Sequence, residues 1–400
     1  MRKYTMKMQR VFFMETLAND KILNAYPNGV VLPWDQIAAG KKAFKKKWDY
    51  LPFRVFFNFI VPFIIFITDV YLPIKYTLSL FFRKKQKLAT KRMFVGHDRR
   101  LYTISKKNSL IKSDDVWLRF LSDTYVLPSN IKVVGILDFV TIGEVYKSAI
   151  QAFLIHLRTV FTMGYNYYFL SYKAYEWCLT DYALRHVPND VELIFSYICD
   201  RFAIMIDKLP HIQKTLIQHG TMHFSNKTVN IPYYEFHPER GFYIWKGLYK
   251  SSPSTVYCYT EIDEWALSNS VIANKPRFIL MGYGFKPSFK AVKKSVLIVS
   301  NYYIFADREE KIISLLQQLD IEIYLKNHPS HANSLYDEMR SKYRFTFIGG
   351  LDTKLPAVDM LISYDSTLAY EYASIGTKVL YYGHFDIENV AEIVSEQLGL

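Results

Sequence analysis

The feature that most constrains the fold of this chain is a regular alternation of short apolar runs with helical stretches, clearest between residues 295 and 382. The segment 307–319 places Ile312, Leu315 and Leu319 on one face, as expected of a helix that packs on a sheet. Strands separated by helices predict a parallel sheet with the spacing of a nucleotide-binding half. The expected strands are 295–300, 321–329 with its exit loop, 345–349, 360–363 and 378–382, and the other expected helices are 334–342 and 366–376.

The same alternation begins upstream, at Met93. A lysine-rich segment with Gly and Pro, residues 284–295, is typical of an interdomain linker. We therefore predict two Rossmann-like α/β domains, residues 91–285 and 286–400, which face a cleft at the carboxyl ends of their strands. The expected strands of the first domain are 93–96, 132–139, 191–196, 215–218, 255–259 and 277–284, with helical segments at 142–161, 200–206 and 267–275.

The positive charge of the chain is concentrated at its N-terminal end. Residues 1–92 contain 18 Lys or Arg and 5 Asp or Glu, which accounts for the whole net charge of +13 and leaves the other 308 residues neutral. A uniformly basic chain would indicate nucleic acid as the partner, whereas a basic segment around a hydrophobic one indicates an anionic membrane surface. We therefore expect no nucleic acid, and a membrane surface contacted through residues 41–92.

The hydrophobic part of this segment is residues 51–82. Its longest charge-free run, residues 55–68, would reach only ~21 Å as a helix, short of the ~30 Å hydrocarbon core of a bilayer. Pro52, Pro62 and Pro73 are each expected to kink or end a helix. Three alternatives stay open for the segment 1–90: a re-entrant or interfacial anchor, a buried helical hairpin on the other domains, and a single membrane span.

One candidate catalytic residue follows the expected strand 215–218. His219 and Gly220 come directly after it, where a parallel sheet presents its ligands. A histidine there can take a proton from an acceptor hydroxyl, and a glycine lets the backbone turn and approach a ligand closely. The alternative is a histidine that only caps the end of the strand.

Two candidate phosphate-binding groups lie in the second domain. Lys326 and His328 stand at the end of the strand 321–329, where they could supply positive charge or donors to a phosphate. Asp365, Ser366 and Thr367 lie between a strand and a helix, where first-turn amides and side-chain hydroxyls bind anions. Glu371, within the same helix, is close enough to reach a ribose. Ordinary helix capping is the alternative for the second group, and a common loop dipeptide, His-Pro, is the alternative for the first.

The ordered set His219-Gly220, Lys326-x-His328-Pro329 and Asp365-Ser366-Thr367, with Glu371 downstream, resembles the motifs of the GT-B glycosyltransferase superfamily over about residues 190–385. It is most similar to the CDP-glycerol glycerophosphotransferases and to the bacterial capsule sialyl- and Kdo-transferases. The resemblance implies that His219 is the acceptor base, that His328 binds the donor phosphate or stabilises the leaving group, and that Ser366 and Thr367 bind phosphate.

The resemblance leads us to expect a sugar transferred from a CMP-, UDP- or GDP-linked donor to a bacterial capsule, lipopolysaccharide or O-antigen acceptor. The sequence shows no DxD motif where a metal-bridged donor needs it, so we expect no metal and no resident cofactor. Cys178, Cys199 and Cys258 form no CxxC, which fits a reducing compartment at the cytoplasmic face of the inner membrane. A CDP-alcohol polyol-phosphate transferase of teichoic-acid type, and a non-catalytic membrane-tethered scaffold on a transferase fold, are the alternatives.

Overall fold

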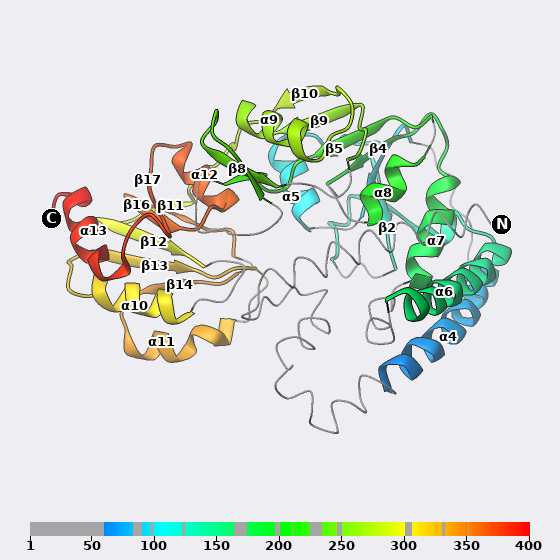
Figure 1. Cartoon of the computed structure of the whole chain (residues 1–400), viewed down its shortest axis with the longest axis horizontal. Coiled ribbons are helices and arrows are strands. Elements are labelled where there is room, and N and C mark those ends of the chain that lie inside the picture. The colour runs from blue at the N-terminus through cyan, green and yellow to red at the C-terminus, as the bar shows by residue number, and fades with distance from the viewer. Residues whose placement is uncertain are drawn as a thin grey trace. The chain divides into compact units, whose positions relative to one another are not determined.

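The computed structural model of the chain divides into two compact units, which are interleaved along the sequence (Figure 1). The N-terminal unit comprises Met1–His219 and Lys246–Leu280, and the C-terminal unit comprises Gly220–Trp245 and Met281–Leu400. The residues that the structure describes are 60–82, 90–96, 99–121, 125–163, 174–196, 201–209, 211–224, 234–245, 250–300, 306–329, 333–350 and 352–400.

The N-terminal unit is built on a 7-stranded sheet of order β10-β9-β5-β4-β1-β2-β3, in which every neighbouring pair is parallel. The central strands are buried, and the rings of Phe94 and Trp117 stack 4.4 Å apart between β1 and β2. The strands are β1 (Arg92–Val95), β2 (Val116–Arg119), β3 (Lys132–Gly135), β4 (Glu192–Phe195), β5 (Lys214–Ile217), β9 (Thr255–Cys258) and β10 (Arg277–Leu280).

The helices of this unit include one that precedes the sheet and two long ones that pack against each other. α4 (Val61–Phe82) packs on α6 (Ile142–Met163), and α6 packs on α7 (Ala174–Arg185). On α6, Gln151 donates a hydrogen bond to the Tyr182 hydroxyl of α7, 3.1 Å away. The shorter helices are α5 (Arg99–Lys107), α8 (Arg201–Asp207) and α9 (Glu261–Ser270), with a 3-10 turn at Ile136–Asp138.

The C-terminal unit is built on a 5-stranded parallel sheet of order β14-β13-β12-β16-β17. Apolar side chains cover both faces, as a parallel sheet requires. A short antiparallel sheet of order β6-β8-β7 and the pair β11–β15 complete its strands. The strands are β6 (His223–Phe224), β7 (Tyr234–His237), β8 (Phe242–Trp245), β11 (Phe289–Lys290), β12 (Ser295–Val299), β13 (Glu322–Lys326), β14 (Thr346–Ile348), β15 (Pro356–Ala357), β16 (Met360–Ser363) and β17 (Lys378–Tyr381).

Helices connect the strands of this sheet in the way that the sequence predicts. β12 continues through α10 (Ala306–Leu316) to β13, and β16 continues through α12 (Thr367–Ala373) to β17. α11 (Asp337–Lys342) precedes β14, and α13 (Val390–Leu398) follows β17. Connections from β12 and β16 run in opposite directions across the sheet, so the order reverses between these two strands. The carboxyl ends of such neighbouring strands are where open α/β sheets bind ligands.

The predicted α/β class with two parallel sheets is confirmed. Pro73 does not end the helix, since α4 runs from Val61 to Phe82 through Asp69 and Pro73. A proline removes one backbone hydrogen bond, and here Pro73 is buried on the side where α4 packs against the unit, so that packing offsets the loss. Pro52 and the lysines of 41–47 lie outside the described residues.

The course of the chain between the units is more complex than one linker. We predicted a single passage at 285/286, whereas residues 220–245 also belong to the C-terminal unit, so the chain passes between units three times. The first passage is the peptide bond between His219 and Gly220. The two residues of the predicted HG motif therefore belong to different units.

Candidate functional site

His219 lies just after β5, and its ring is oriented by the backbone at the end of the neighbouring strand β4. Its Nδ1 is 2.7 Å from the carbonyl oxygen of Ser196. A carbonyl can only accept, so Nδ1 carries the hydrogen, and a neutral ring then has its lone pair on Nε2. β4 is also where the strand order of the N-terminal sheet reverses, since β1 lies between β2 and β4. This is the tautomer that a general base requires, in the place where the fold presents ligands.

The residues that follow His219 contact the start of α12 within the C-terminal unit. The Thr221 amide donates to the Thr367 hydroxyl oxygen, 3.3 Å away. A Cβ on Gly220 would lie 3.8 Å from the same oxygen, an ordinary contact. Gly220 and Thr221 therefore lie against the start of α12, although Thr221 and Thr367 are 146 positions apart in the sequence.

Ser366 and its neighbours form a cluster of hydroxyl groups at the carboxyl end of β16. Ser366 is the N-cap of α12, and its Oγ accepts from the Ala369 amide at 3.1 Å. The hydroxyls of Ser363 and Ser366 are 3.1 Å apart. The capping predicted for this position is therefore present, with Thr367 as the first residue of the helix. First-turn amides and hydroxyls at this end of a parallel sheet are suited to phosphate oxygens.

Asp365 accepts a hydrogen bond from the Tyr370 hydroxyl, 2.9 Å away on the next turn of α12. Burial, and next the charge of Asp365, raise the pKa of Tyr370 far above its usual range. Tyr370 therefore stays a neutral donor that holds the Asp365 carboxylate beside the cap. The rings of His223 and Tyr370 meet edge to face, with centroids 4.8 Å apart. Glu371 lies half-buried on the same helix, and its contact with a ribose stays a prediction.

Lys326 has a different environment from the one we expected. Its side chain is 7% exposed, and its Nζ donates to the carbonyl oxygens of Gly349 and Gly350, the latter at 2.9 Å. The ammonium therefore ties the turn after β14 to the end of β13. Its role as a phosphate ligand stays a prediction. The contacts support a role for Lys326 in positioning the neighbouring His328.

The turn at Gly349 and Gly350 is the feature that sequence reasoning missed. A Cβ on Gly350 would lie 2.5 Å from the His328 carbonyl oxygen, and one on Gly349 would lie 2.9 Å from Asp352 Oδ2. Asn327 Nδ2 donates to Asn333 Oδ1 at 3.0 Å, and this oxygen is also 3.4 Å from the Gly350 amide. A close-packed turn therefore fixes the loop that bears His328. A pair of glycines directly after a strand was the available signal.

The two phosphate-binding candidates of this unit lie at the same edge of one sheet. His328 follows β13 and Ser366 follows β16, and β12 is the only strand between them. Strands are ~4.8 Å apart, so the two strand ends are separated by about 10 Å. A nucleoside diphosphate is long enough to reach both. Thr221, Thr367 and His328 therefore lie at or next to the carboxyl ends of the strands of the C-terminal sheet.

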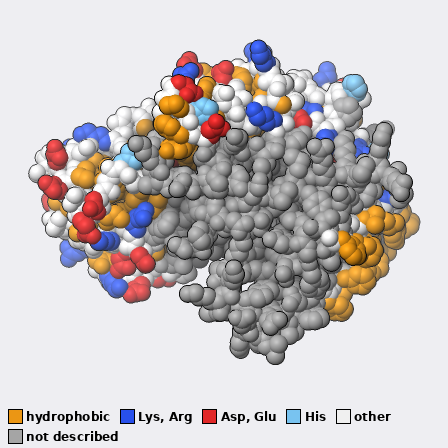
Figure 2. Space-filling model, in the orientation of Figure 1, with side chains coloured by type: hydrophobic (Ala, Val, Ile, Leu, Met, Phe, Trp, Pro, Cys, Tyr) orange, Lys and Arg blue, Asp and Glu red, His pale blue; other side chains and the backbone are white. Residues whose placement is uncertain are grey.

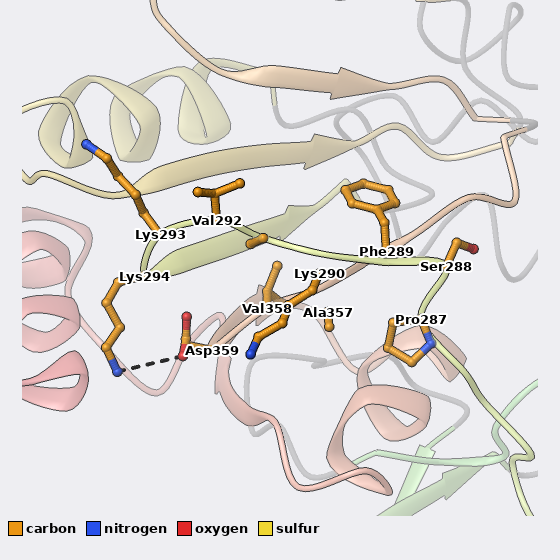
Figure 3. A pocket seen from close by; sticks show the side chains of 11 residues that line it. Pro287, Ser288, Phe289, Lys290, Val292, Lys293, Lys294, Ala357, Val358 and Asp359 are labelled. Carbon is orange, nitrogen blue, oxygen red and sulfur yellow. Dashed lines mark ion pairs between the residues drawn. The ribbon is translucent and has the colours of Figure 1, made fainter.

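A cavity of about 640 Å³ lies at the opposite edge of this sheet (Figure 3). The segment 287–294, which we predicted as a linker, lines it together with residues 357–359, and Lys294 Nζ is 3.7 Å from Asp359 Oδ1. These segments precede β12 and β16, so the cavity is at the amino ends of the strands. It contains none of the predicted site residues, and ligands of parallel sheets bind at the other end.

Within the described ranges, no group of three or more His, Cys, Asp or Glu side chains could hold a metal ion. Metal independence stays a prediction, because the phosphates of a bound donor can themselves coordinate a metal ion that few protein side chains hold. The described thiols, Cys178 and Cys258, are both buried and unbridged.

Comparisons with known proteins found similarity at a low level only. No family model matches the sequence, and no curated protein matches it either. Solved structures that it is similar to include the wall teichoic acid polymerase TagF, at TM-score 0.41 and 10% identity over 86% of this chain and 91% of that one. MurG of Acinetobacter baumannii has TM-score 0.38 and 10% identity, over 77% and 90%. A UDP-forming trehalose-phosphate synthase of Burkholderia xenovorans has 0.39 and 10%, over 78% and 92%. At these TM-scores, the assignment of function depends on this chain's own residues.

Proposed function

We propose that this chain is a GT-B-type glycosyltransferase, which moves a sugar from a nucleotide-activated donor to a bacterial surface glycan such as capsule, lipopolysaccharide or O-antigen. The observation that supports it best is the hydrogen bond from the Thr221 amide to the Thr367 hydroxyl. It brings the residues after a base-competent histidine against the start of α12, beside the point where the order of a parallel sheet reverses.

In the proposed reaction, His219 Nε2 takes the proton of the acceptor hydroxyl as that oxygen attacks the anomeric carbon of the donor. The bond between this carbon and the phosphate oxygen breaks, and the nucleotide leaves with the bonding electrons. The hydrogen bond from Nδ1 to Ser196 orients the ring and stabilises the imidazolium that forms. General-base assistance of this kind contributes ~10²–10⁴-fold.

The charge that grows on the departing phosphate needs hydrogen-bond donors fixed in advance. Ser366 and Thr367 would supply hydroxyls and first-turn amides, and His328 would supply a ring N–H. Lys326 would act through the turn at Gly349 and Gly350 that it holds, and Asp365 through its bond to Tyr370. Glu371 would contact the ribose, and no resident metal or cofactor takes part.

A CDP-alcohol polyol-phosphate transferase of teichoic-acid type is the second candidate. The order HG, then His328-Pro329, then Asp365-Ser366-Thr367 favours it, because this family has its HG, HP and D-x-S-S motifs in that order. In that reaction the phosphorus is attacked, so phosphate moves to the acceptor with the alcohol. A non-catalytic membrane-tethered scaffold is the third candidate, which substitution of both histidines would test.

The anionic surface of a membrane is the proposed partner of residues 41–92, at the cytoplasmic face of the inner membrane. Of this range the structure describes 60–82 and 90–92, which include α4. Among the described residues, the segment Phe63–Phe82 alone has the length and composition to cross a membrane. The acceptor, a glycan or a lipid-linked glycan, would reach the N-terminal unit from this surface.

The test of the transferase proposal is a thermal-shift screen of the full chain with CMP, CDP, UDP, GDP and ADP. A nucleotide present at about 100 times its dissociation constant should stabilise the protein by ~2.7 kcal/mol. Thr367→Val and His328→Ala should each reduce this stabilisation, whereas Thr346→Val, at an exposed position of β14, should retain it. If no nucleotide raises the melting temperature of the wild type, the proposal is wrong.

The two enzymatic candidates are separated by analysis of the acceptor. With donors labelled separately in the sugar or polyol and in the phosphate, a glycosyltransferase leaves the phosphate label on the nucleotide. A polyol-phosphate transferase moves it to the acceptor. If in-cell glycan production persists after His219→Ala and His328→Ala and is lost after removal of residues 41–92, the scaffold proposal holds.

A further inference from the structure

The side chains of α4 are distributed in the reverse of the usual pattern for a surface helix. A helix on a water-soluble domain turns its apolar side inward and its polar side outward. Here the polar Thr68, Asp69 and Thr77 lie on the half-buried side, close to the buried Ile65 and Tyr76. The exposed side is apolar apart from Lys75, and consists of Phe63, Ile64, Phe66, Ile67, Val70, Tyr71, Ile74, Leu78, Phe81 and Phe82.

The helix α6 shows the same inversion, although it belongs to the α/β architecture of the N-terminal unit. Its buried side includes the polar Ser148, Gln151 and His156 beside the apolar Val145, Ala152 and Ile155. Among the side chains of α6 that the structure describes, the large exposed ones are apolar apart from Lys147, and they are Ile142, Tyr146, Ile150, Phe153, Leu154, Leu157 and Phe161. We call the exposed apolar side chains of both helices the apolar face.

The two helices lie side by side, so the apolar face is continuous (Figures 1 and 2). Figure 2 shows hydrophobic side chains gathered on the side where Figure 1 draws α4 and α6. Several of its rings are more than half exposed, including Phe63 at 62%, Phe81 at 69% and Phe161 at 83%. Water-soluble monomers rarely expose an apolar patch of more than a few hundred Å² unless something binds it.

α4 is fixed on the unit by two lateral contacts. The Asp69 carboxylate is 2.5 Å from His156 Nε2 of α6, and both groups are largely buried. Seven positions later, the rings of Tyr76 and Tyr175 of α7 stack 6.1 Å apart. A helix that crossed the bilayer would have to take Asp69 away from His156 and into hydrocarbon, which is costly. The contacts therefore favour α4 lying along the unit, with its exposed side outward.

The charges of the apolar face fit an anionic partner. Asp69 and Glu144 are the only acidic residues of the two helices, and neither is on the face. Asp69 contacts His156, and Glu144 is half-buried and contacts His186 at 2.7 Å. The exposed Lys75 and Lys147 belong to the face, and the sequence continues after α4 with Arg83-Lys84-Lys85. Apolar side chains edged by cations, with Tyr71 and Tyr146 among them, are typical of a helix at a bilayer interface.

We propose that α4 and α6 together form a single docking face for an anionic bilayer, and that α4 lies in the interface and does not cross the membrane. The proposal deepens the membrane part of the proposed function, on which it rests, and adds a helix outside residues 41–92 to the membrane contact. It also combines two of the alternatives left open by the sequence, since α4 packs on the domain through one side and meets lipid through the other.

The test is flotation of the full chain with vesicles of phosphatidylethanolamine and phosphatidylglycerol. The double variant Ile150→Glu and Phe153→Glu alters two exposed side chains of α6 and leaves α4 intact. We expect it to bind at least about tenfold more weakly, because two large apolar side chains no longer enter the interface. Val126→Glu, at a position 80% exposed in the same unit, is the matched control and should bind like the wild type. Vesicles of phosphatidylcholine alone should bind all forms weakly.

A second measurement does not depend on introduced charge. An environment-sensitive dye attached at Ile150→Cys should shift to shorter wavelengths on addition of anionic vesicles, and the same dye at Val126→Cys should not. A dye at residue 150 that stays in water while the wild type binds overturns the proposal.

The outcomes of the flotation test are distinguishable. If the wild type binds and the double variant binds equally well, α6 does not meet the membrane, and this inference fails while the proposed membrane association stands. If the wild type does not bind anionic vesicles, both fail. If the double variant turns a dimer into a monomer in solution without vesicles, a second copy of the chain covers the face, and the bilayer proposal is wrong.

Discussion

At the scale of single residues, the hydrogen bond between His219 Nδ1 and the Ser196 carbonyl selects one tautomer of the ring, in which Nε2 has the lone pair that a general base needs. Asparagine places an amide donor about where Nδ1 lies but has no equivalent of Nε2. We therefore expect His219→Asn to melt like the wild type and to lose ~10²–10⁴-fold in turnover. Product formation and the melting temperature are the two measurements. Turnover that survives in His219→Asn would assign the base to another residue.

Substitution by alanine should affect the stability of the protein differently at Gly350 and at Gly220. In Gly350→Ala the new Cβ would lie 2.5 Å from the His328 carbonyl oxygen, so the backbone must move, at a cost of about 1–3 kcal/mol. In Gly220→Ala the nearest atom would be Thr367 Oγ1 at 3.8 Å, which allows the fold to persist. We expect only Gly350→Ala to lower the melting temperature, as measured by circular dichroism. A loss of nucleotide binding in Gly220→Ala without a change in stability would indicate close approach of a ligand there.

These contrasts show what the sequence could and could not predict at this scale. His219, Ser366 and Thr367 were identifiable because each follows an apolar strand, and strand ends are where ligands bind. The engagement of Lys326 by the carbonyls of Gly349 and Gly350 was not identifiable. This contact depends on how the chain after β14 folds back against β13, and the hydrophobic periodicity of the sequence does not predict that fold.

At the scale of elements, the start of α12 combines a structural cap with a proposed phosphate site. Ser366→Ala removes the side-chain acceptor of the Ala369 amide and should cost about 1 kcal/mol, as N-cap losses do. The loss should be visible as faster hydrogen exchange of the α12 amides. Ser341→Ala removes a hydroxyl near the end of the exposed helix α11, and it should leave α12 unchanged. Equal exchange in Ser366→Ala and the wild type would contradict the assigned cap.

The helix α7 contains a carboxylate whose burial makes stability depend on pH. Burial raises the pKa of Asp181 to about 6, although Arg185 and Lys208 lower it. The folded state therefore holds this proton more tightly than the unfolded chain, whose pKa is near ~3.9. The stabilisation is fully present below about pH 4 and is lost as the pH rises through 6.

Asp181→Asn should remove this dependence, because the amide keeps the shape of the neutral acid. We expect it to stabilise the protein by about 3 kcal/mol at neutral pH and to have little effect near pH 4. Melting temperatures across this range are the measurement. A variant that is less stable than the wild type at neutral pH would show that the ion pair with Arg185, 3.0 Å away, outweighs desolvation.

Among the elements themselves, prediction succeeded where the hydrophobic period was long and regular. The parallel strands β12, β13 and β16 are largely apolar runs between helical segments, and their positions agree with the expected ones. The continuity of α4 through Pro73 was not predictable, because it depends on packing against another helix. The antiparallel strands β6 to β8 were also missed, since β6 has two residues and carries no recognisable period.

At the scale of the whole molecule, the two compact units are interleaved in sequence, because Gly220–Trp245 of the C-terminal unit stands between the two segments of the N-terminal unit. From the sequence we predicted two α/β domains that are joined by a single connection. Such an insertion is invisible to strand and helix periodicity, because the local pattern does not say which core a segment joins. Each unit has its own sheet and its own buried apolar residues, so each should have its own unfolding transition.

Calorimetry of the full chain should therefore resolve two transitions that respond to different changes. The nucleotide found in the screen should raise only the transition of the C-terminal unit, because Thr221, His328, Ser366 and Thr367 all belong to it. Asp181→Asn should raise only the other transition at neutral pH, because α7 belongs to the N-terminal unit. A single transition that both changes raise together would mean that the two units unfold as one cooperative body. A nucleotide that raises only the N-terminal transition would place the donor on the sheet of His219, against the proposal that His328, Ser366 and Thr367 bind it.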